Sequence, residues 1–146
     1  MAERTQAELE IAAPPARIMA TIADIDSYPQ WCPGVSTARV LVEFPDGRPR
    51  EVEMVFDSGP IQDTHIYRYD SWGDREVRWH LIAGETVTGL WGVYSCHTLQ
   101  PRNTLVSYRL AMDLAVPIIG ALKRRAEKVI VRTALKGLKE RIESQP

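Results

Sequence analysis

The sequence has few of the features that mark metal, redox or membrane-spanning proteins. Its two cysteines, Cys32 and Cys96, have no metal-ligand spacing, so we expect two idle thiols rather than a disulfide. No two of the three histidines, at positions 65, 80 and 97, have the spacing of a zinc motif. No apolar run approaches the roughly 20 residues of a membrane span, and the first residues lack the apolar stretch of a secretory signal. We therefore expect a cytoplasmic protein with no metal and no cofactor.

What is present is the composition of an ordinary globular protein. The 146 residues are 45% hydrophobic and 25% charged, which predicts one domain spanning residues 1–146. The net charge of -1 hides an asymmetry, because residues 117–146 hold eight Lys or Arg against three Glu. This segment indicates a solvated helix face, a complement to the acidic remainder, or a surface for transient contact with an anionic membrane. The low overall charge argues against nucleic acid, and the sequence leaves a monomer and a weak homodimer open.

The order of periodic segments predicts an α+β fold. Residues 5–11 alternate as a strand, and Pro14-Pro15 then opens a short helix with Ile18, Met19 and Ile22 at helical spacing. A second short helical turn runs through Trp31 and is closed by residues 32–34. From Val35 to Leu114 the period is two, which predicts six further antiparallel strands joined by short turns. The result is a sheet of about seven strands.

A long C-terminal helix is predicted from Pro117 onward. Its apolar positions recur with a 3.6-residue period. They are Ile118, Ile119, Leu122, Ala126, Val129, Ile130, Thr133, Ala134, Leu138 and Ile142. In a chain this short, only this helix can cover the apolar face of the sheet. A strongly curved sheet leaves a gap under such a helix, which becomes a cavity. A filled core is the alternative, and the periodicity does not decide between the two.

Three criteria give the candidate ligand-binding residues. They are strand parity, membership of the apolar stripe of the helix, and, for tryptophan, a side chain large enough to line a cavity. The candidates are Val40, Val42, Met54, Phe56, His65, Tyr67, Trp79, Trp91, Tyr108, Leu110, Leu122, Ala126 and Val129.

Two stretches resemble the helix-grip superfamily, which contains START lipid-transfer domains, birch pollen allergen relatives and bacterial polyketide cyclase/dehydrase-type proteins. The first stretch is residues 13–19 followed by residues 22–31, with an Asp, a Tyr-Pro pair and a Trp; the second is residues 105–110. The resemblance covers nearly the whole chain and implies a curved sheet wrapped around a long C-terminal helix. It also implies either binding of a lipid, polyketide or isoprenoid, or closure and dehydration of polyketide rings.

Function then depends on the polar residues of the cavity. His65 shares a strand face with Tyr67 and Tyr69, so these three are the candidates for proton transfer in a polyketide cyclase, aromatase or dehydratase. His80 lies among charged residues and is expected to face water. The sequence places no carboxylate in the interior, and an active site needs a convergent set of groups. A carrier or sensor of a hydrophobic molecule is therefore the first hypothesis, an enzyme acting in the same cavity is the second, and enzymatic activity stays open.

Overall fold

The computed structural model describes residues 4–57, 62–116 and 120–145. Strand β1 (Thr5–Ile11) is followed by helix α1 (Pro15–Ala23), the single 3-10 turn η1 (Ile25–Ser27) and the short helix α2 (Tyr28–Trp31). Strands β2 to β7 come next: β2 (Val35–Glu43), β3 (Pro49–Asp57), β4 (Gln62–Trp72), β5 (Glu76–Ala83), β6 (Val87–Gln100) and β7 (Asn103–Leu114). Helix α3 (Gly120–Glu143) is the last element. The helix start predicted at Pro117, with Ile118 and Ile119, lies outside the described residues.

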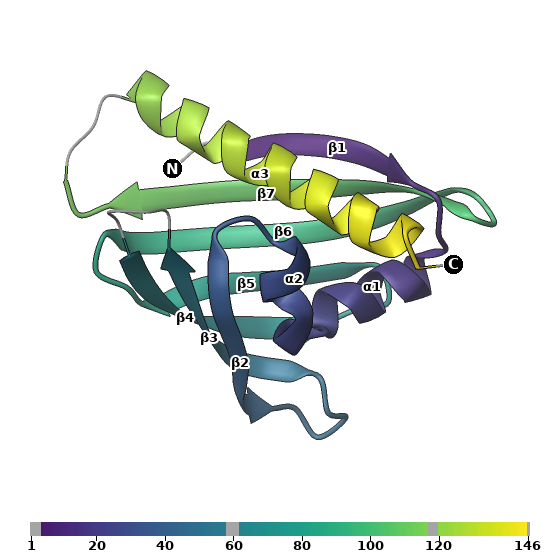
Figure 1. Cartoon of the computed structure of the whole chain (residues 1–146), viewed down its shortest axis with the longest axis horizontal. Helices are drawn as coiled ribbons and strands as arrows, with labels where there is room; N and C mark the ends of the chain where they lie inside the picture. Colours follow the sequence, from purple (N-terminus) through teal and green to yellow (C-terminus); the bar gives the residue numbers. More distant parts are fainter. Residues whose placement is uncertain (1–3, 58–61, 117–119, 146) are drawn as a thin grey trace.

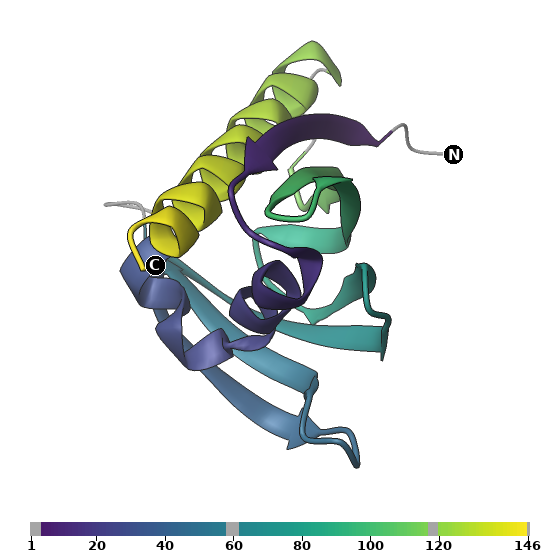
Figure 2. The same cartoon turned by 90° about the vertical axis from the view of Figure 1, so that its right-hand side faces the viewer.

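The seven strands of the described residues form one antiparallel sheet in the order β1-β7-β6-β5-β4-β3-β2. β1 and β2 are therefore its two edges, and β1 returns across the molecule to pair with β7, Thr5 lying opposite Leu110. The sheet curves strongly, and α3 spans its concave side (Figures 1 and 2). This arrangement confirms the predicted α+β class and the helix-grip architecture. No helix in the described part of the chain is both long and apolar enough to cross a bilayer.

The turns follow from local chemistry. Gly34 has a φ of 83° and Gly47 a φ of 89°, a left-handed conformation that glycine adopts without the steric cost of a Cβ. Gly34 lies between α2 and β2, and Gly47 lies in the β2–β3 hairpin, where its N–H donates to the Phe44 carbonyl. Both glycines are thus fixed by the backbone that the turn requires.

The two short helices lie on the concave side of the sheet, the side that α3 also covers (Figures 1 and 2). Proline stands at the first position of α1, where a missing N–H costs nothing, and Ile18 and Ile22 are fully buried beneath it. The Tyr28 hydroxyl of α2 donates to the Ile22 carbonyl and so ties the two helices together. α2 meets α3 at Gly137, where a Cβ would lie 2.3 Å from the Trp31 carbonyl oxygen.

Helix α3 packs on the sheet with only part of the predicted stripe, namely Ala134, Leu138 and Ile142. Its buried apolar side chains are Val131, Ala134, Leu135, Leu138 and Ile142. Of the predicted stripe, Leu122 and Val129 are exposed, so their placement against the sheet was wrong. The helix carries two apolar stripes of the same period, and the sheet covers the one that also contains the buried Glu127.

Candidate functional site

A cavity of about 320 Å³ lies between the concave face of the sheet and α3. Strands β3 to β7, helix α2 and the middle of α3 all contribute lining residues. Most of the lining is aromatic or aliphatic, as is typical of sites that bury a small organic molecule. The sequence left a filled core and a cavity open, and the structure has a cavity.

Tilted aromatic rings form one wall of the cavity. The ring centroids of Tyr94 and Tyr108 are 4.6 Å apart, and those of Trp79 and Tyr94 are 5.3 Å apart. Trp79 lies flat across Gly92 of the neighbouring strand, where a Cβ would come within 2.3 Å of the indole. The missing side chain at Gly92 therefore sets how far the Trp79 ring can lie back from the cavity.

Strand β4 brings three polar side chains together at this cavity. Because side chains two residues apart share a strand face, Asp63, His65 and Tyr67 all point inward, and all three are buried. The Asp63 Oδ2 and His65 Nε2 atoms are 3.0 Å apart, and His65 Nδ1 lies 2.6 Å from the Tyr67 hydroxyl. We call this hydrogen-bonded chain the β4 relay. It contradicts the expectation that no carboxylate is buried.

Asp63 is held in its ionised form. Burial raises the pKa of this carboxyl, but hydrogen bonds from His65 and from the backbone N–H groups of Glu85 and Val87 outweigh burial, so the pKa lies below its ordinary value. The N–H of Thr86 also donates to Oδ2, at 3.1 Å. Asp63 therefore fastens the turn between β5 and β6 to β4 while it accepts a hydrogen bond from His65.

The β4 relay can either accept or donate a proton at its cavity end. With a neutral imidazole, Nε2–H donates to Asp63 and Nδ1 accepts from the Tyr67 hydroxyl, which leaves the Tyr67 oxygen free to accept from a ligand. With an imidazolium, Nδ1–H donates to Tyr67, whose hydroxyl then donates to a ligand. Burial, followed by the neighbouring Tyr108, raises the pKa of Tyr67 far above its ordinary value. Tyr67 is therefore a neutral hydroxyl near neutral pH, and His65 Nδ1 is its hydrogen-bond partner.

Six of the predicted ligand-binding residues line the cavity. They are Met54, Phe56, His65, Tyr67, Trp79 and Tyr108. Tyr69, named as a proton-transfer candidate, also lines it but lies outside the β4 relay. Strand parity is sufficient to place these residues because β3, β4, β5 and β7 turn one face toward α3.

The strands contribute four predicted residues that do not line the cavity. Trp91 is exposed because it points to the convex face, opposite to its neighbours Leu90 and Gly92. Val42 is exposed on edge strand β2, where register shifts occur on both sides of it. Val40 and Leu110 are part of the packed core rather than of the cavity wall.

None of the three helix residues predicted to bind the ligand lines the cavity. Leu122 and Val129 are exposed, and Ala126 packs against the core without reaching the cavity. The helical residues that do reach it are Ile130, Thr133 and Ala134.

Several lining residues are not among the predicted ligand-binding residues. They include Tyr28, Asp63, Leu90, Tyr94, Met112 and Ala134. Asp63 has the parity of His65 and Tyr67, so the period of two would have found it. An acidic residue at the start of a strand is usually solvated, which conceals this signal.

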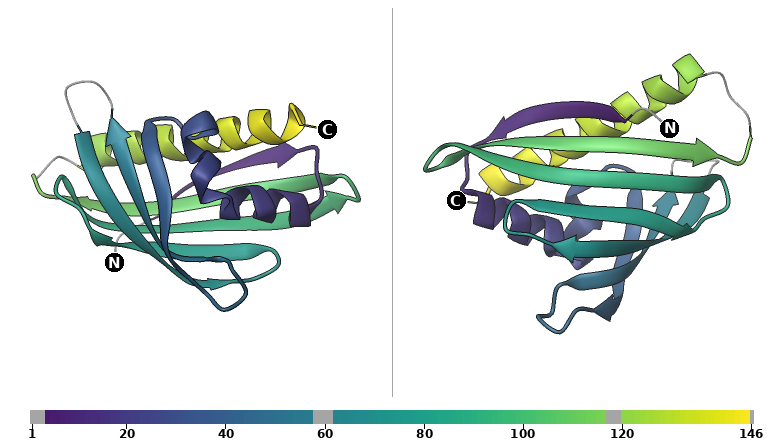
Figure 3. Two further views of the ribbon diagram at one scale, coloured as in Figure 1. Left: turned by 60° about the horizontal axis from the view of Figure 1, so that its bottom comes forward. Right: turned by 180° about the vertical axis from the view of Figure 1, so that it is seen from behind.

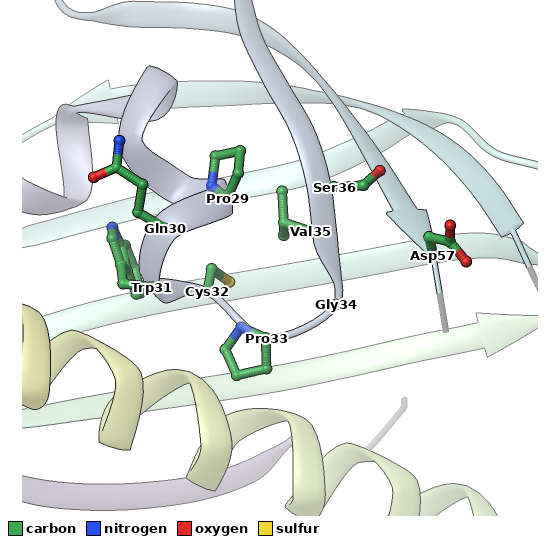
Figure 4. A pocket seen from close by; sticks show the side chains of 9 residues that line it. All are labelled: Pro29, Gln30, Trp31, Cys32, Pro33, Gly34, Val35, Ser36 and Asp57. Carbon is green, nitrogen blue, oxygen red and sulfur yellow. The ribbon is translucent and has the colours of Figure 1, made fainter. Parts of the chain in front are cut away.

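A second, shallower pocket of about 420 Å³ adjoins the cavity at the loop between α2 and β2 (Figure 4). It shares Cys32 and Pro33 with the cavity lining. Burial raises the pKa of the Cys32 thiol to about 12, so this thiol is protonated and unreactive near neutral pH. Cys32 and Cys96 are both free. In residues 4–57, 62–116 and 120–145, no three His, Cys, Asp or Glu side chains gather as a metal site would require.

Comparison with known proteins agrees with this architecture. The model of the family described as polyketide cyclase / dehydrase and lipid transport matches residues 2–143. A START superfamily protein from Mycobacterium smegmatis is 21% identical, with a TM-score of 0.92 and 99% of both chains covered. The Zhui aromatase/cyclase from Streptomyces sp. R1128 is 16% identical, with a TM-score of 0.78 over 99% of this chain and 96% of that one. Ara h 8.0201 is 12% identical, with a TM-score of 0.73 over 99% and 100%.

At these identities, the likeness to solved structures shows the fold. No curated protein matches the sequence.

Proposed function

Because the chain belongs to the polyketide cyclase/dehydrase and lipid-transport family, we propose that it carries or senses a hydrophobic small molecule in its cavity. A lipid, a polyketide and an isoprenoid all have the required apolar character. The observation that supports this function is the cavity itself, an apolar space with the β4 relay as its main polar feature. The two free thiols support a reducing compartment such as the cytosol as the place of action.

The cavity favours an apolar guest with one polar group. Its volume lies at the lower end of the roughly 300 to 1,000 Å³ typical of small-molecule sites. Each Å² of apolar ligand surface removed from water contributes about 25 cal/mol, so the aromatic wall supplies most of the affinity. Tyr67 fixes the orientation, since a ligand hydroxyl or carbonyl placed at its oxygen makes a hydrogen bond that an apolar tail cannot make.

Thermal unfolding of delipidated protein tests this function. A molecule that binds only the native state stabilises it by RT ln(1 + [L]/Kd), about 2.7 kcal/mol at one hundred times Kd, so melting temperature rises with ligand concentration. Ala134→Phe places a ring in the cavity and should abolish the shift. Ala20→Phe makes the same substitution at an exposed position of α1 and should preserve the shift. A folded wild type that responds to no member of a broad lipid and polyketide panel refutes the proposal.

The β4 relay favours a second candidate function, an aromatase, cyclase or dehydratase acting in the same cavity. Tyr67 would take a proton from an acidic C–H or O–H of the substrate as its own proton moves to His65 Nδ1. The imidazolium so formed would lie 3.0 Å from the ionised Asp63, which stabilises it. Return of the proton along the same path to a substrate oxygen would complete the transfer.

Substitution of His65 separates the two functions. If the β4 relay moves protons, His65→Ala abolishes turnover of a poly-β-ketone substrate, while ligand affinity stays within about tenfold, or 1.4 kcal/mol. His80→Ala is the matched control, because His80 also pairs with a carboxylate, Asp70, at 3.1 Å but on the outer face. Unchanged turnover in His65→Ala would remove the β4 relay from any mechanism and leave the carrier function.

A further inference from the structure

Helix α3 carries a second apolar stripe that nothing in the described structure covers. Its members are Leu122, Val129 and Ile130, which are 51%, 57% and 37% exposed. The spacing of seven and eight residues puts all three on one side of the helix. The side chains that pack on the sheet, such as Val131 and Leu135, lie on another side. We call these three residues the outer apolar stripe.

A row of cations runs along α3 beside the outer apolar stripe. Arg125, Lys128, Arg132 and Lys136 are all exposed, and their spacing of three and four residues places them on one helix face. None of the four makes an ion pair with another described residue. Their positive charge is therefore available to an anionic partner.

Two of these cations also line a surface groove of about 490 Å³ between β1 and α3. Arg4, Arg124, Arg125 and Lys128 contribute to the groove, and none of its lining residues is acidic. The start of α3 extends past the start of β1 (Figures 1 and 3), and the groove lies beside it. Basic and apolar residues are thus exposed together on one helix.

The outer apolar stripe leads into the cavity. Ile130 belongs to the stripe and also lines the cavity, and Thr133 and Ala134, one turn further along α3, line it as well. A surface that receives the outer apolar stripe therefore meets the edge of the cavity. A helix face that served only to keep the protein in solution would not need to run from exposed apolar side chains into the cavity.

We infer that this face of α3 docks on a membrane surface rich in anionic lipid. The outer apolar stripe enters the boundary between headgroups and acyl chains, and the cations beside it lie at the level of the lipid phosphates. Charge complementarity selects an anionic bilayer, since four unpaired cations next to apolar side chains match a surface that is negative outside and apolar within. Membrane docking is a separate property from the proposed function. If the protein also carries a ligand as proposed, docking would let that ligand exchange between the bilayer and the cavity.

Vesicle flotation with the full chain tests the docking. Phosphatidylcholine vesicles with phosphatidylglycerol should carry the protein, pure phosphatidylcholine vesicles should carry little, and added salt should release it. The double variant Leu122→Ser/Val129→Ser should lose most of the binding. Arg125→Gln/Arg132→Gln should weaken it about 20- to 30-fold, since each cation near an anionic surface contributes about fivefold.

Matched controls come from the sheet and its turns. Val42→Ser/Leu99→Ser removes two apolar side chains of similar exposure, and Arg50→Gln/Arg102→Gln removes two exposed cations; neither pair should change flotation. None of these residues lines the cavity, so ligand-induced thermal shifts in solution should be intact in every variant. If wild type shows no ligand-induced thermal shift, the proposed function fails and the docking proposal is unaffected. If a variant loses the shift, that variant has changed ligand binding rather than docking alone.

Three results would overturn the inference. The first is equal flotation on neutral and anionic vesicles, or on neither. The second is unchanged flotation of the α3 variants. The third is a concentration-dependent dimer, seen by analytical ultracentrifugation, that Leu122→Ser/Val129→Ser abolishes without affecting flotation, because it would assign the outer apolar stripe to a second copy of the chain.

Discussion

Asp63 is the residue that links the chemistry of the cavity to the stability of the sheet. It accepts hydrogen bonds from His65 and from the backbone N–H groups of Glu85, Thr86 and Val87. Hydrogen bonds to a buried charged group contribute about 1.5 to 3 kcal/mol each when their removal leaves the partner unpaired. A single carboxylate therefore orients His65 and also holds the turn between β5 and β6.

Replacing Asp63 should change how stability depends on pH. Because the folded pKa of Asp63 lies below its unfolded value of about 3.9, its contribution is complete above that value and declines as pH falls through the folded pKa. Asp63→Asn should cost about 2 kcal/mol in denaturant unfolding at pH 7 and progressively less below pH of about 4. Asp70→Asn, the exposed control, should cost little at any pH. If the difference in unfolding free energy between wild type and Asp63→Asn stays constant with pH, it contradicts the ionised state of Asp63.

Gly92 is the second single residue on which the cavity depends. A Cβ at this position would lie 2.3 Å from the Trp79 ring, so Gly92→Ala should push the indole toward the cavity. We expect a loss of about 1 to 3 kcal/mol in stability, as for other overpacked sites, and a weaker ligand-induced thermal shift. Gly120→Ala, where the nearest atom belongs to a flexible arginine 3.6 Å away, should be neutral or stabilising. If Gly92→Ala keeps wild-type stability and ligand response, the Trp79 ring can move away from a Cβ at position 92 without entering the cavity.

At residue scale, the sequence predicted much of the strand contribution to the site. Parity alone predicts the face on which Met54, His65 and Tyr67 line the cavity, because a strand alternates strictly between two faces. Parity failed for Val42, where bulges in an edge strand shift the register. The size of Trp91 predicted a place in the cavity wall, but its side chain is exposed.

At the scale of elements, Glu127 fastens α3 to the sheet. It is only 1% exposed, and its carboxyl oxygens accept hydrogen bonds from the Thr5 hydroxyl at 2.7 Å and from the Met112 N–H at 3.0 Å. One side chain thus joins the helix to both β1 and β7. Such a clamp fixes the height of α3 above the cavity, because the bonded atoms leave no freedom to slide.

Replacing Glu127 should loosen this clamp. Glu127→Leu leaves the buried Met112 N–H and the half-buried Thr5 hydroxyl without this partner and should cost about 2 to 4 kcal/mol in denaturant unfolding. Glu127→Gln keeps an acceptor oxygen and should cost less. Hydrogen exchange should show faster exchange of the Met112 amide in Glu127→Leu, whereas the exposed control Glu140→Gln should match wild type. Slow Met112 exchange in Glu127→Leu would show that the clamp is dispensable.

The order and kind of the elements could be read from the sequence, but the orientation of α3 could not. Two apolar stripes run along it with the same period, so periodicity cannot say which one the sheet covers. Burial of a charged residue such as Glu127 runs against the usual preference and depends on two partners more than a dozen residues away. The misplacement of Leu122 and Val129 follows from this ambiguity.

At the scale of the whole molecule, the cavity results from how the sheet closes. The strand order leaves β1 and β2 as open edges, and the curved sheet carries α3 across its concave side (Figure 2). The periodicity predicts the helix and the family resemblance implies the curvature, but the periodicity leaves open whether a gap or a filled core lies between them. Whether large side chains fill a core or line a space depends on their three-dimensional packing, which periodicity does not record.

Native mass spectrometry of protein purified without detergent tests the central claim most directly. Wild-type protein, either as purified or after incubation with a hydrophobic ligand that raises its melting temperature, should carry one molecule of defined mass. Ala134→Phe should carry none, and Ala20→Phe should match wild type. The same bound mass on Ala134→Phe and wild type, or a wild type that stays bare under every condition, would contradict a cavity that holds a hydrophobic guest.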